Sequence, residues 1–600
     1  MDSLLPYYER ELGFLRDECK QLCERYPALT GMLGGPGGGE SADPLVERII
    51  QALAMLAGRA AKRHDDGYPR LTEAILGSIE PALLRQFPSS TVVQFLAGEG
   101  ASPALIARGT QMTSEPVDGV KCTFTTVYDV ARGSFNIASA EFTPDIGAPA
   151  AASLPQEASS RISIGWNSLQ QDTPARVRVF IDGDRSFSAT LRDTLFLNAI
   201  AAYVVLPGST RWIRLRAVPL QAVGFEDAEA MTPTDDRSHP AYRLLTEFFA
   251  FPEKFNFLDI DLAAILEEAP LARNGGTLHI VLRDVALDSD RARMLSGLTA
   301  RHLQLDCTPA VNLFLRPGVP ITVTNTAPDY ILSADAKRPD AYDIVAVQAA
   351  RTIDTSHGAP QVTELTPFYS TRYAQPDAPY WVASRDYSGD AGVVRPPLRI
   401  ALVDQELEPS RARVRTISTE LLCSNGALPS MLVCGAQDGD LMATGSFGTA
   451  RVRLLRKPTL PAMPASGRGT HWKLVSQLAL GSRPLTNLGL REFQEMLLLY
   501  DLSHSAAVAR MVNGITHISF AKAMDWVHED AVSSMMPGVE IRLAIAPEAF
   551  VGTGVHVFAQ VLDRFLGMYG QLNMFTRLVV TSEDGRELVR FAPRCGKGIA

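Results

Sequence analysis

The stretch "AYRLLTEFFAFPEKFNFLDI", residues 241–260, holds six aromatic side chains in twenty positions. So many rings could stack nucleic-acid bases, line a ligand pocket or fill a core between domains. Leu245, Phe248 and Phe249 would share one face of a helix, and Pro252 would end that helix. A stacking platform needs exposed rings in a basic groove, whereas apolar neighbours dominate here. The sequence therefore predicts a buried core plug at a domain junction, formed by Leu245, Phe248, Phe249, Phe251 and Phe255.

The composition is that of a multidomain globular protein. The chain has 600 residues, which predicts about four domains at roughly 150 residues each. Its formal net charge of −9 argues against a broad nucleic-acid interface, because such an interface needs a basic surface. No run of about 18 apolar residues and no secretory signal are visible. The seven cysteines are scattered without a CxxC pair, which is typical of a reduced, cytoplasmic protein.

Hydrophobic periodicity divides the chain into three expected regions. Residues 1–90 have a helical pattern, whereas from 91 to 307 the period falls to two, with Gly, Pro and Asp turns between short strands. Residues 308–600 mix strand-like runs with amphipathic helices. We therefore expect a multidomain α+β fold. It would have an N-terminal helical segment, a β-rich middle region that contains the aromatic plug, and a mixed α/β C-terminal region.

The first helix carries an apolar seam with a seven-residue period. Its members alternate in steps of three and four: Leu5, Tyr8, Leu12, Leu15, Cys19, Leu22 and Tyr26. A strict seam of this kind suits packing against another long helix. If that helix belongs to another chain, the seam residues are partner-binding, and Leu15 and Leu22 would pack at least partly against the partner.

The second helix offers the alternative partner within the same chain. It is expected from Pro44 to Arg63, with Asp43 as N-cap, after a break at "GGPGGGESA". An intramolecular hairpin of the two helices would cover the first seam without any partner. The second helix has an apolar stripe of its own, formed by Leu45, Ile49, Leu53, Leu56 and Ala60.

Candidate catalytic and metal motifs each lack a required residue. "GTGVHV" at 552–557 has Val557 where a dinucleotide loop needs its third glycine. "GGPGGGE" at 34–40 is not followed by the Gly-Lys-Ser/Thr of a P-loop. "VHED" at 527–530 lacks the second histidine of a zinc helix, and Cys19 and Cys23 have no second ligand pair at metal spacing. The sequence therefore predicts no cofactor, no metal and no enzymatic activity.

Several segments, in order along the whole chain, resemble one family. "YRLLTEFFAFPEKFNFLDI" resembles the "EYFAFPEKF" signature of the TssF family, also called VasA or ImpG. "YYERELGFLR" and "ADPLVERIIQALAMLAGR" are similar to the family's opening helices, and "PAVNLF", "LTPFYS", "YWVASR" and "ELLCSN" follow in the family's order. "HWKLVSQLAL" and "FVGTGVHVFAQVLDRFLGMYGQLNMFTRLVV" are similar to its final segment. The glycine-rich break before Ala42 is longer than the family pattern, which affects only a loop.

This resemblance implies a structural protein of the type VI secretion system baseplate, with a fold similar to that of phage-tail wedge proteins. Two copies would clasp one TssG chain through helical segments. TssE and the adaptor TssK would complete the wedge, which surrounds the spike hub VgrG and initiates the contractile sheath. The protein would be cytoplasmic, in a baseplate docked at the inner-membrane complex, and would meet that complex only indirectly. No cofactor and no catalytic residue are implied.

Two alternatives differ from this expectation. The chain could be a wedge protein of another contractile tail, such as a phage-like particle. It could also be an enzyme or a sugar-binding module that uses the aromatic stretch, in which case Phe248 and Phe251 would be exposed. Burial of these rings would favour the core plug.

Overall fold

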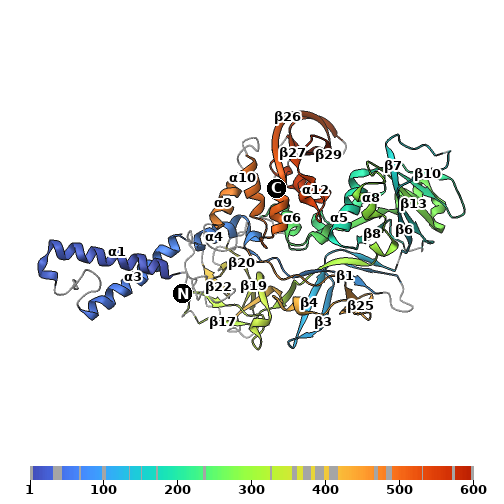
Figure 1. Cartoon of the computed structure of the whole chain (residues 1–600). Helices are drawn as coiled ribbons and strands as arrows, with labels where there is room; N and C mark the ends of the chain where they lie inside the picture. The colour runs from blue at the N-terminus through green and yellow to red at the C-terminus, as the bar shows by residue number, and fades with distance from the viewer. Residues whose placement is uncertain are drawn as a thin grey trace.

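The computed structural model shows a helical arm, a β-rich body and a C-terminal layer in which helices cover a sheet (Figure 1). The multidomain α+β class expected from the sequence is confirmed. The glycine-rich segment 34–40 lies outside the described residues. The structure describes residues 4–30, 43–65, 69–96, 103–133, 135–150, 152–169, 173–233, 238–324, 327–354, 361–368, 380–385, 397–403, 416–464, 470–480, 489–529, 532–570 and 574–595.

The arm consists of α1 (Leu5–Arg25) and α3 (Pro44–Asp65), which pack against each other and project from the body (Figure 1). Each helix has a proline in its first turn, where the missing N–H would have no helical partner anyway. The short helix η1 (Pro27–Leu29) follows α1. At the base of the arm, α4 (Pro69–Ile79) and η2 (Pro81–Leu84) lead into the first strand.

A closed barrel joins three distant parts of the chain. Its strands follow the order β1-β15-β4-β3-β24-β25, and neighbouring strands are antiparallel. Two further strands form a small antiparallel sheet: β2 (Ala104–Ile106), which lies between β1 and β3 in the sequence, and β5 (Val130–Arg132), which follows β4. The barrel strands are β1 (Ser90–Phe95), β3 (Gln111–Val117), β4 (Val120–Thr126), β15 (Cys307–Val311), β24 (Leu441–Gly445) and β25 (Gly448–Leu454).

Two antiparallel sheets enclose a second core in the region between β5 and β15. The first sheet has the order β10-β9-β13-β7-β6 and the second β11-β12-β8-β14. Along β8 the alternate residues Val177, Val179 and Ile181 enter this core, as the period of two predicts. The strands are β6 (Ile137–Thr143), β7 (Ala158–Trp166), β8 (Arg176–Ile181), β9 (Ala199–Val205), β10 (Trp212–Arg214), β11 (Leu220–Ala222), β12 (Phe257–Asp261), β13 (Gly276–Arg283) and β14 (Leu303–Gln304). The intervening helices are α5 (Arg185–Asp193), η3 (Thr194–Asn198), η4 (Asp227–Glu229), α6 (Pro240–Ala250), η5 (Pro252–Phe255), α7 (Leu262–Glu268), η6 (Pro270–Asn274), α8 (Asp290–Leu295) and η7 (Ala300–His302).

An eight-stranded sheet follows the barrel strand β15. Its order is β16-β23-β19-β20-β21-β22-β18, with β17 paired to β23, and only the β20–β21 pair is parallel among these described strands. The short helix η8 (Pro339–Ala341) lies between β18 and β19, and η9 (Leu428–Met431) lies between β23 and the barrel strand β24. Its strands are β16 (Phe314–Pro317), β17 (Ile321–Thr322), β18 (Tyr330–Ile331), β19 (Asp343–Asp354), β20 (Gln361–Pro367), β21 (Tyr380–Arg385), β22 (Leu398–Val403) and β23 (Thr416–Ser424).

The C-terminal layer packs helices on one face of a mixed sheet. The long antiparallel pair β26–β27 adds β28 in parallel, and α12 forms the crossover between β27 and β28. A hairpin formed by β28 and β29 turns at Asp584-Gly585, where Gly585 has a φ of 78°. The elements are α9 (Thr470–Leu480), α10 (Leu490–Leu498), α11 (Ala506–Asn513), β26 (Ile515–Glu529), β27 (Val532–Ile545), η11 (Pro547–Phe550), α12 (Val555–Gly567), β28 (Phe575–Ser582), β29 (Glu587–Arg590) and β30 (Arg594–Cys595).

The closed barrel contains strands from both sides of one expected domain boundary. A boundary at 307/308 would separate β1, β3 and β4 from β15, β24 and β25, although all six strands form one closed barrel. The helix α6 lies before that boundary, yet most of its buried residues belong to the C-terminal core. The division therefore stays a prediction, and long-range strand pairing connects its parts. No helix in the described ranges combines the length and hydropathy that a membrane span requires.

Candidate protein-binding interface

The aromatic stretch 241–260 is interior. It forms α6, η5 and the start of β12, and the side chains named in the sequence analysis are 0 to 6% exposed. Pro252 begins η5 directly after α6, so the two arms of the stretch fold back over the same region. The buried residues are Leu245, Phe248, Phe249, Phe251 and Phe255. These rings offer no exposed platform for a base or a sugar.

The stretch contributes to three hydrophobic cores at once. Phe248 and Phe255 belong to the C-terminal core, where the Phe248 ring lies 6.2 Å from that of Phe558 on α12. Phe251 belongs to another core, together with Phe257 and Val92 of the barrel strand β1. Leu258 extends into the core between the two antiparallel sheets. The segment thus ties together parts of the chain that are far apart in sequence.

The basic side chains of the stretch are buried in ion pairs. Lys254 and Glu247 form a fully buried ion pair. Each carboxylate oxygen of Glu247 has a different partner. Oε2 meets Lys254, whereas Oε1 accepts the backbone N–H of Met231 at 2.8 Å. Burial lowers the pKa of Lys254, and the nearby Glu247 carboxylate opposes that shift. A lysine held in this way cannot provide the positive surface that a nucleic-acid groove requires.

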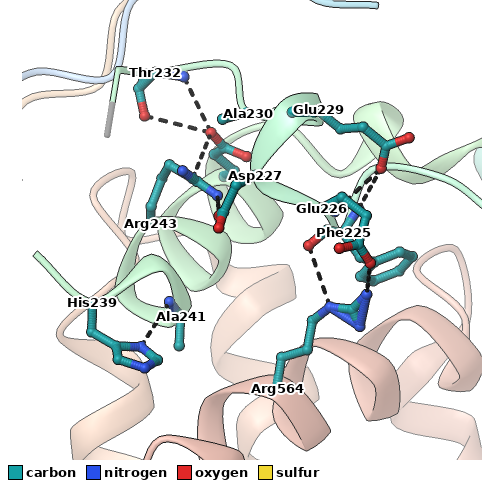
Figure 2. Close-up of polar contacts among 12 residues, drawn as sticks. Phe225, Glu226, Asp227, Glu229, Ala230, Thr232, His239, Ala241, Arg243 and Arg564 are labelled. Carbon is teal, nitrogen blue, oxygen red and sulfur yellow. Dashed lines mark hydrogen bonds and ion pairs between the residues drawn. The ribbon is translucent and has the colours of Figure 1, made fainter. Parts of the chain in front are cut away.

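Polar contacts connect the segment 225–227, which precedes α6, to both α6 and α12. Figure 2 shows Arg243 on α6 reaching the carboxylate of Asp227, with an N–O distance of 2.7 Å. From α12, Arg564 reaches Glu226 at 2.5 Å and the backbone oxygen of Phe225 at 3.3 Å (Figure 2). Glu229 accepts three successive backbone N–H groups of residues 224–226. These contacts hold the loop before α6 between two helices, which is a structural role.

The two cavities found at this junction are small. Their volumes are about 40 and 50 Å³, which is room for a few water molecules. Within the described residues, no group of three or more His, Cys, Asp or Glu side chains could hold a metal ion. The surface with the clearest functional character lies instead on the arm.

Small residues on α3 allow the two arm helices to approach closely. A Cβ atom at Gly58 would lie 3.1 Å from the backbone nitrogen of Tyr8. One turn earlier, Ala54 is fully buried, and Ile50 is 7% exposed. At the other end of the contact, Arg16 and Glu47 form an ion pair of 2.5 Å. The helices therefore run antiparallel, and the intramolecular hairpin considered from the sequence is present.

The predicted seam on α1 lies only partly in this contact. No residue of α1 is buried. Tyr8, Leu12, Leu15 and Cys19 are half-buried along the hairpin. The remaining seam residues are exposed, at 52% for Leu5, 43% for Leu22 and 56% for Tyr26. The chain's own second helix thus covers part of the seam, and the proposed contact of Leu15 and Leu22 with another chain stays a prediction.

The largest uncovered apolar surface of the arm is on α3, opposite the face that packs on α1. It is the stripe noted from the sequence, whose four large members are 50 to 68% exposed: Leu45, Ile49, Leu53 and Leu56. Ala60 continues the stripe and is also exposed. We call these five residues the α3 stripe. The sequence predicts the partner contact on α1 and leaves the exposure of the α3 stripe open. In the structure the small residues Ala54 and Gly58 face α1, so the stripe lies on the other side of its helix.

Comparison with known proteins gives the class of this chain. A family model described as "Type VI secretion system, TssF" matches residues 1–598. The chain therefore belongs to the TssF family of type VI secretion proteins. It is similar to the type VI secretion system component TssF1 of Pseudomonas aeruginosa, with 29% identity over 627 aligned positions that cover 99% of this chain and 98% of that protein.

Two solved structures have a similar fold. One is a chain of the type VI secretion system TssK-TssF-TssG baseplate subcomplex, with a TM-score of 0.70 and 22% identity over 92% of this chain and 99% of that one. The other is a chain of the baseplate complex from the type VI secretion system, with a TM-score of 0.55, 20% identity and 99% coverage of both chains. At this level of identity the likeness establishes the fold.

Proposed function

We propose that this chain is a structural wedge component of the type VI secretion baseplate and that it binds a neighbouring protein through the α3 stripe. The exposure of this stripe carries the proposal. Leu45, Ile49 and Leu56 recur at steps of four and seven on one side of a helix that projects from the body. Such a stripe suits packing against a helix of another chain. Family membership and the baseplate structures with similar folds support the same role.

The partner that fits this surface best is TssG, with two copies of the present chain on one TssG. The TssK-TssF-TssG subcomplex contains a relative of this fold together with TssG and TssK. TssE and the spike hub VgrG are further proposed neighbours in the wedge. In this arrangement the protein is cytoplasmic, and it meets the inner-membrane complex only through TssK. It acts as a scaffold without a cofactor or a catalytic role.

Charge substitutions on the α3 stripe test the proposal. In Ile49→Asp/Leu53→Asp two exposed apolar residues become acidic, so the arm should stay folded while its partner face is lost. Burying these charges in an apolar contact costs several kcal/mol, and we expect TssG capture to weaken by about 100-fold or more. The matched control is Arg48→Gln/Arg59→Gln on the same helix, which lowers the net charge by the same amount. The measurement is affinity capture of co-expressed TssG, with circular dichroism and limited proteolysis as folding checks.

A second double variant addresses the seam on α1. Leu15→Asp/Leu22→Asp should also reduce TssG capture if the partner helix reaches both helices of the arm. Leu15 is half-buried against α3, so this variant should in addition open the hairpin, whereas the stripe variant should not. Unchanged TssG capture by both folded variants would refute binding through the arm. Loss of capture together with loss of the global fold would favour a purely intramolecular role for the seam.

The alternative functions have less support. A sugar-binding module or an enzyme that uses the aromatic stretch would need exposed rings, whereas the rings of 241–260 are buried. A wedge protein of another contractile tail would use the same fold and the same arm. The TssG capture experiment distinguishes that alternative, since it depends on a type VI partner.

A further inference from the structure

The hairpin of β26 and β27 extends beyond the sheet to which it belongs. β28 pairs with β27 only from Gly538 to Ile545. The β26–β27 pairing continues outward for another six residue pairs, from Met524↔Pro537 to Glu529↔Val532. Figure 1 shows β26 at the outer edge of the C-terminal layer. Among the described residues, the outer part of the hairpin therefore pairs with no third strand.

One face of this hairpin is mainly apolar, with Lys522 as its charged residue. Near the base, Ile541 and Leu543 are fully buried in the C-terminal core, which the helices α10, α11 and α12 share. Side chains two residues apart on a strand point to the same face, so Pro537 and Met535 continue the face of Ile541. Trp526 pairs with Met535 and Met524 with Pro537, which brings both β26 residues onto that face.

Beyond the helices, this face is uncovered. Met524 is 59% exposed, and Trp526 and Met535 are each 56% exposed. We call these three residues the hairpin patch. The opposite face differs, because its charged side chains are already paired: Arg577 contacts both Asp525 and Glu540, and Glu540 also meets Arg590 at 3.1 Å. Among the described apolar side chains of the outer hairpin, those of the patch face are therefore the uncovered ones.

We propose that the hairpin patch docks an amphipathic α-helix of a partner protein that carries an acidic residue. A helix fits because helices already cover the inner part of the same face, and one more helix would continue that layer. The acidic residue is inferred from Lys522. This lysine is exposed and lies on the patch face, two residues before Met524. Among the described residues Lys522 has no ion-pair partner, so a carboxylate on the incoming helix would complement it.

The size of the patch limits the kind of contact that it forms. A stable interface buries on the order of 800 Å² on each partner, and three half-exposed side chains supply well under that area. The docked helix must therefore belong to a protein that a larger interface already holds near this chain, which raises its effective concentration. This inference rests on the proposed function, because assembly into the baseplate supplies that larger interface.

Zero-length cross-linking tests the contact in the assembled complex. The full chain is purified with its co-expressed TssG and TssK neighbours and treated with a carbodiimide, which joins an amine to a carboxylate only where the two touch. We expect Lys522 to be linked to an Asp or Glu of a partner segment with apolar residues at helical spacing. Lys522→Arg keeps the charge but removes the reactive amine, so the link should disappear while the complex remains.

Substitutions at the patch distinguish docking from chance proximity. Trp526→Glu should reduce the Lys522 link by about tenfold or more, since about 1.4 kcal/mol corresponds to a factor of ten. Leu287→Glu is the matched control, because Leu287 is 72% exposed and lies elsewhere in the fold. It should leave the link unchanged. Circular dichroism and limited proteolysis check that each variant is folded.

Three results would overturn the inference. The first is the absence of any intermolecular link from Lys522, and the second is a link that Trp526→Glu leaves intact. The third is a link from Lys522 to a carboxylate of a second copy of this chain, which would mean that the patch contacts another copy and not a partner protein. If TssG fails to co-purify, the proposed function fails by itself. In that case, the presence or absence of a Lys522 link to the proteins that remain in the complex still tests whether the hairpin patch is a docking surface.

Discussion

Single residues explain why the aromatic stretch is structural. Glu247 and Lys254 have no exposed surface, and the Tyr128 hydroxyl donates to the backbone oxygen of Lys254 at 2.9 Å. A buried ion pair contributes little net stability compared with apolar packing, but losing one partner leaves an uncompensated charge. The residues that looked basic in the sequence therefore fix the geometry of the junction, and the rings around them supply the apolar burial.

Phe249→Ala should be strongly destabilising. The side chain is 6% exposed and its ring lies 5.4 Å from that of Phe248. Removing a buried phenylalanine ring costs roughly 3–5 kcal/mol, from the lost burial and from the cavity left behind. Urea unfolding followed by fluorescence measures the change, with the exposed Leu287→Ala as control, which should lie within about 0.5 kcal/mol of the parent. A cost for Phe249→Ala as small as that of the control would contradict its role in the core.

Stability should fall as the pH is lowered below about 6.5, in part through His556. Burial and then the nearby Arg192 lower the pKa of His556 to about 3. Between this pKa and the ordinary value of about 6.5, the unfolded chain binds a proton at His556 that the folded chain does not. Each pH unit in this window then removes up to about 1.4 kcal/mol from the free energy of unfolding.

The variant His556→Gln isolates this contribution. At pH 5 the parent should have lost about 2 kcal/mol through His556 relative to pH 7, and the variant should lack this loss. His279, whose pKa burial lowers to about 4, contributes equally in both proteins and so cancels in the comparison. The measurement is the urea midpoint at the two pH values. The same pH dependence in parent and variant would show that His556 does not carry it.

At the scale of elements, α12 depends on a residue from a distant part of the chain. Its N-cap position is Gly554, which has no side chain to accept the first N–H groups. The carboxylate of Asp193 accepts the backbone N–H of Val555 at 2.7 Å and that of His556 at 3.1 Å. The core helix of the C-terminal layer is thus capped by the end of α5, 361 positions before Gly554 in the sequence.

Asp193→Ala should loosen the start of α12. Loss of a capping side chain costs about 1–2 kcal/mol. Hydrogen exchange at residues 555–558 should accelerate more than exchange in β28. Asp193→Asn keeps an acceptor oxygen and should have a smaller effect. Equal protection of α12 in all three proteins would rule out the cap.

The arm hairpin is also sensitive to a single side chain. At Gly58 a Cβ atom would meet backbone atoms of α1 at 3.1 to 3.3 Å, which cannot move without shifting the helix. Gly58→Leu should therefore separate the helices and increase hydrogen exchange along α1, while the body remains folded. Gly13→Leu is the matched control, because a Cβ there has nothing within 4 Å. If both variants leave exchange in α1 unchanged, the close approach of the helices is not essential for the arm.

For the whole molecule, the exposed apolar surfaces predict association. The α3 stripe and the hairpin patch lie on separate projections of the chain, and exposed apolar patches of this kind mark interaction sites (Figure 1). The isolated chain should self-associate in sedimentation velocity as its concentration rises. Ile49→Asp/Leu53→Asp should reduce this association, and bound TssG should suppress it. A salt-insensitive monomer at all concentrations that also ignores TssG would contradict the baseplate role.

The sequence by itself determined the local structure and the family. Periodicity and capping located α1 and α3, the period of two marked the β-rich middle region, and apolar neighbours indicated that the Phe248 ring is buried. These properties depend on residues close in sequence, whose spacing fixes which side chains share a face. The ordered motifs across the chain gave the resemblance to the TssF family, to which the chain belongs.

Only the tertiary structure decided which of these faces are covered. β1 pairs with β25, and Asp193 caps α12, across more than 350 residues, and no local pattern encodes such a partner. For the same reason the seam of α1 and the stripe of α3 looked alike in the sequence. Ala54 and Gly58 let α1 approach one side of α3, so that side is buried and the opposite side remains open. Burial depends on the steric fit between segments distant in sequence, which exists only once the chain has folded.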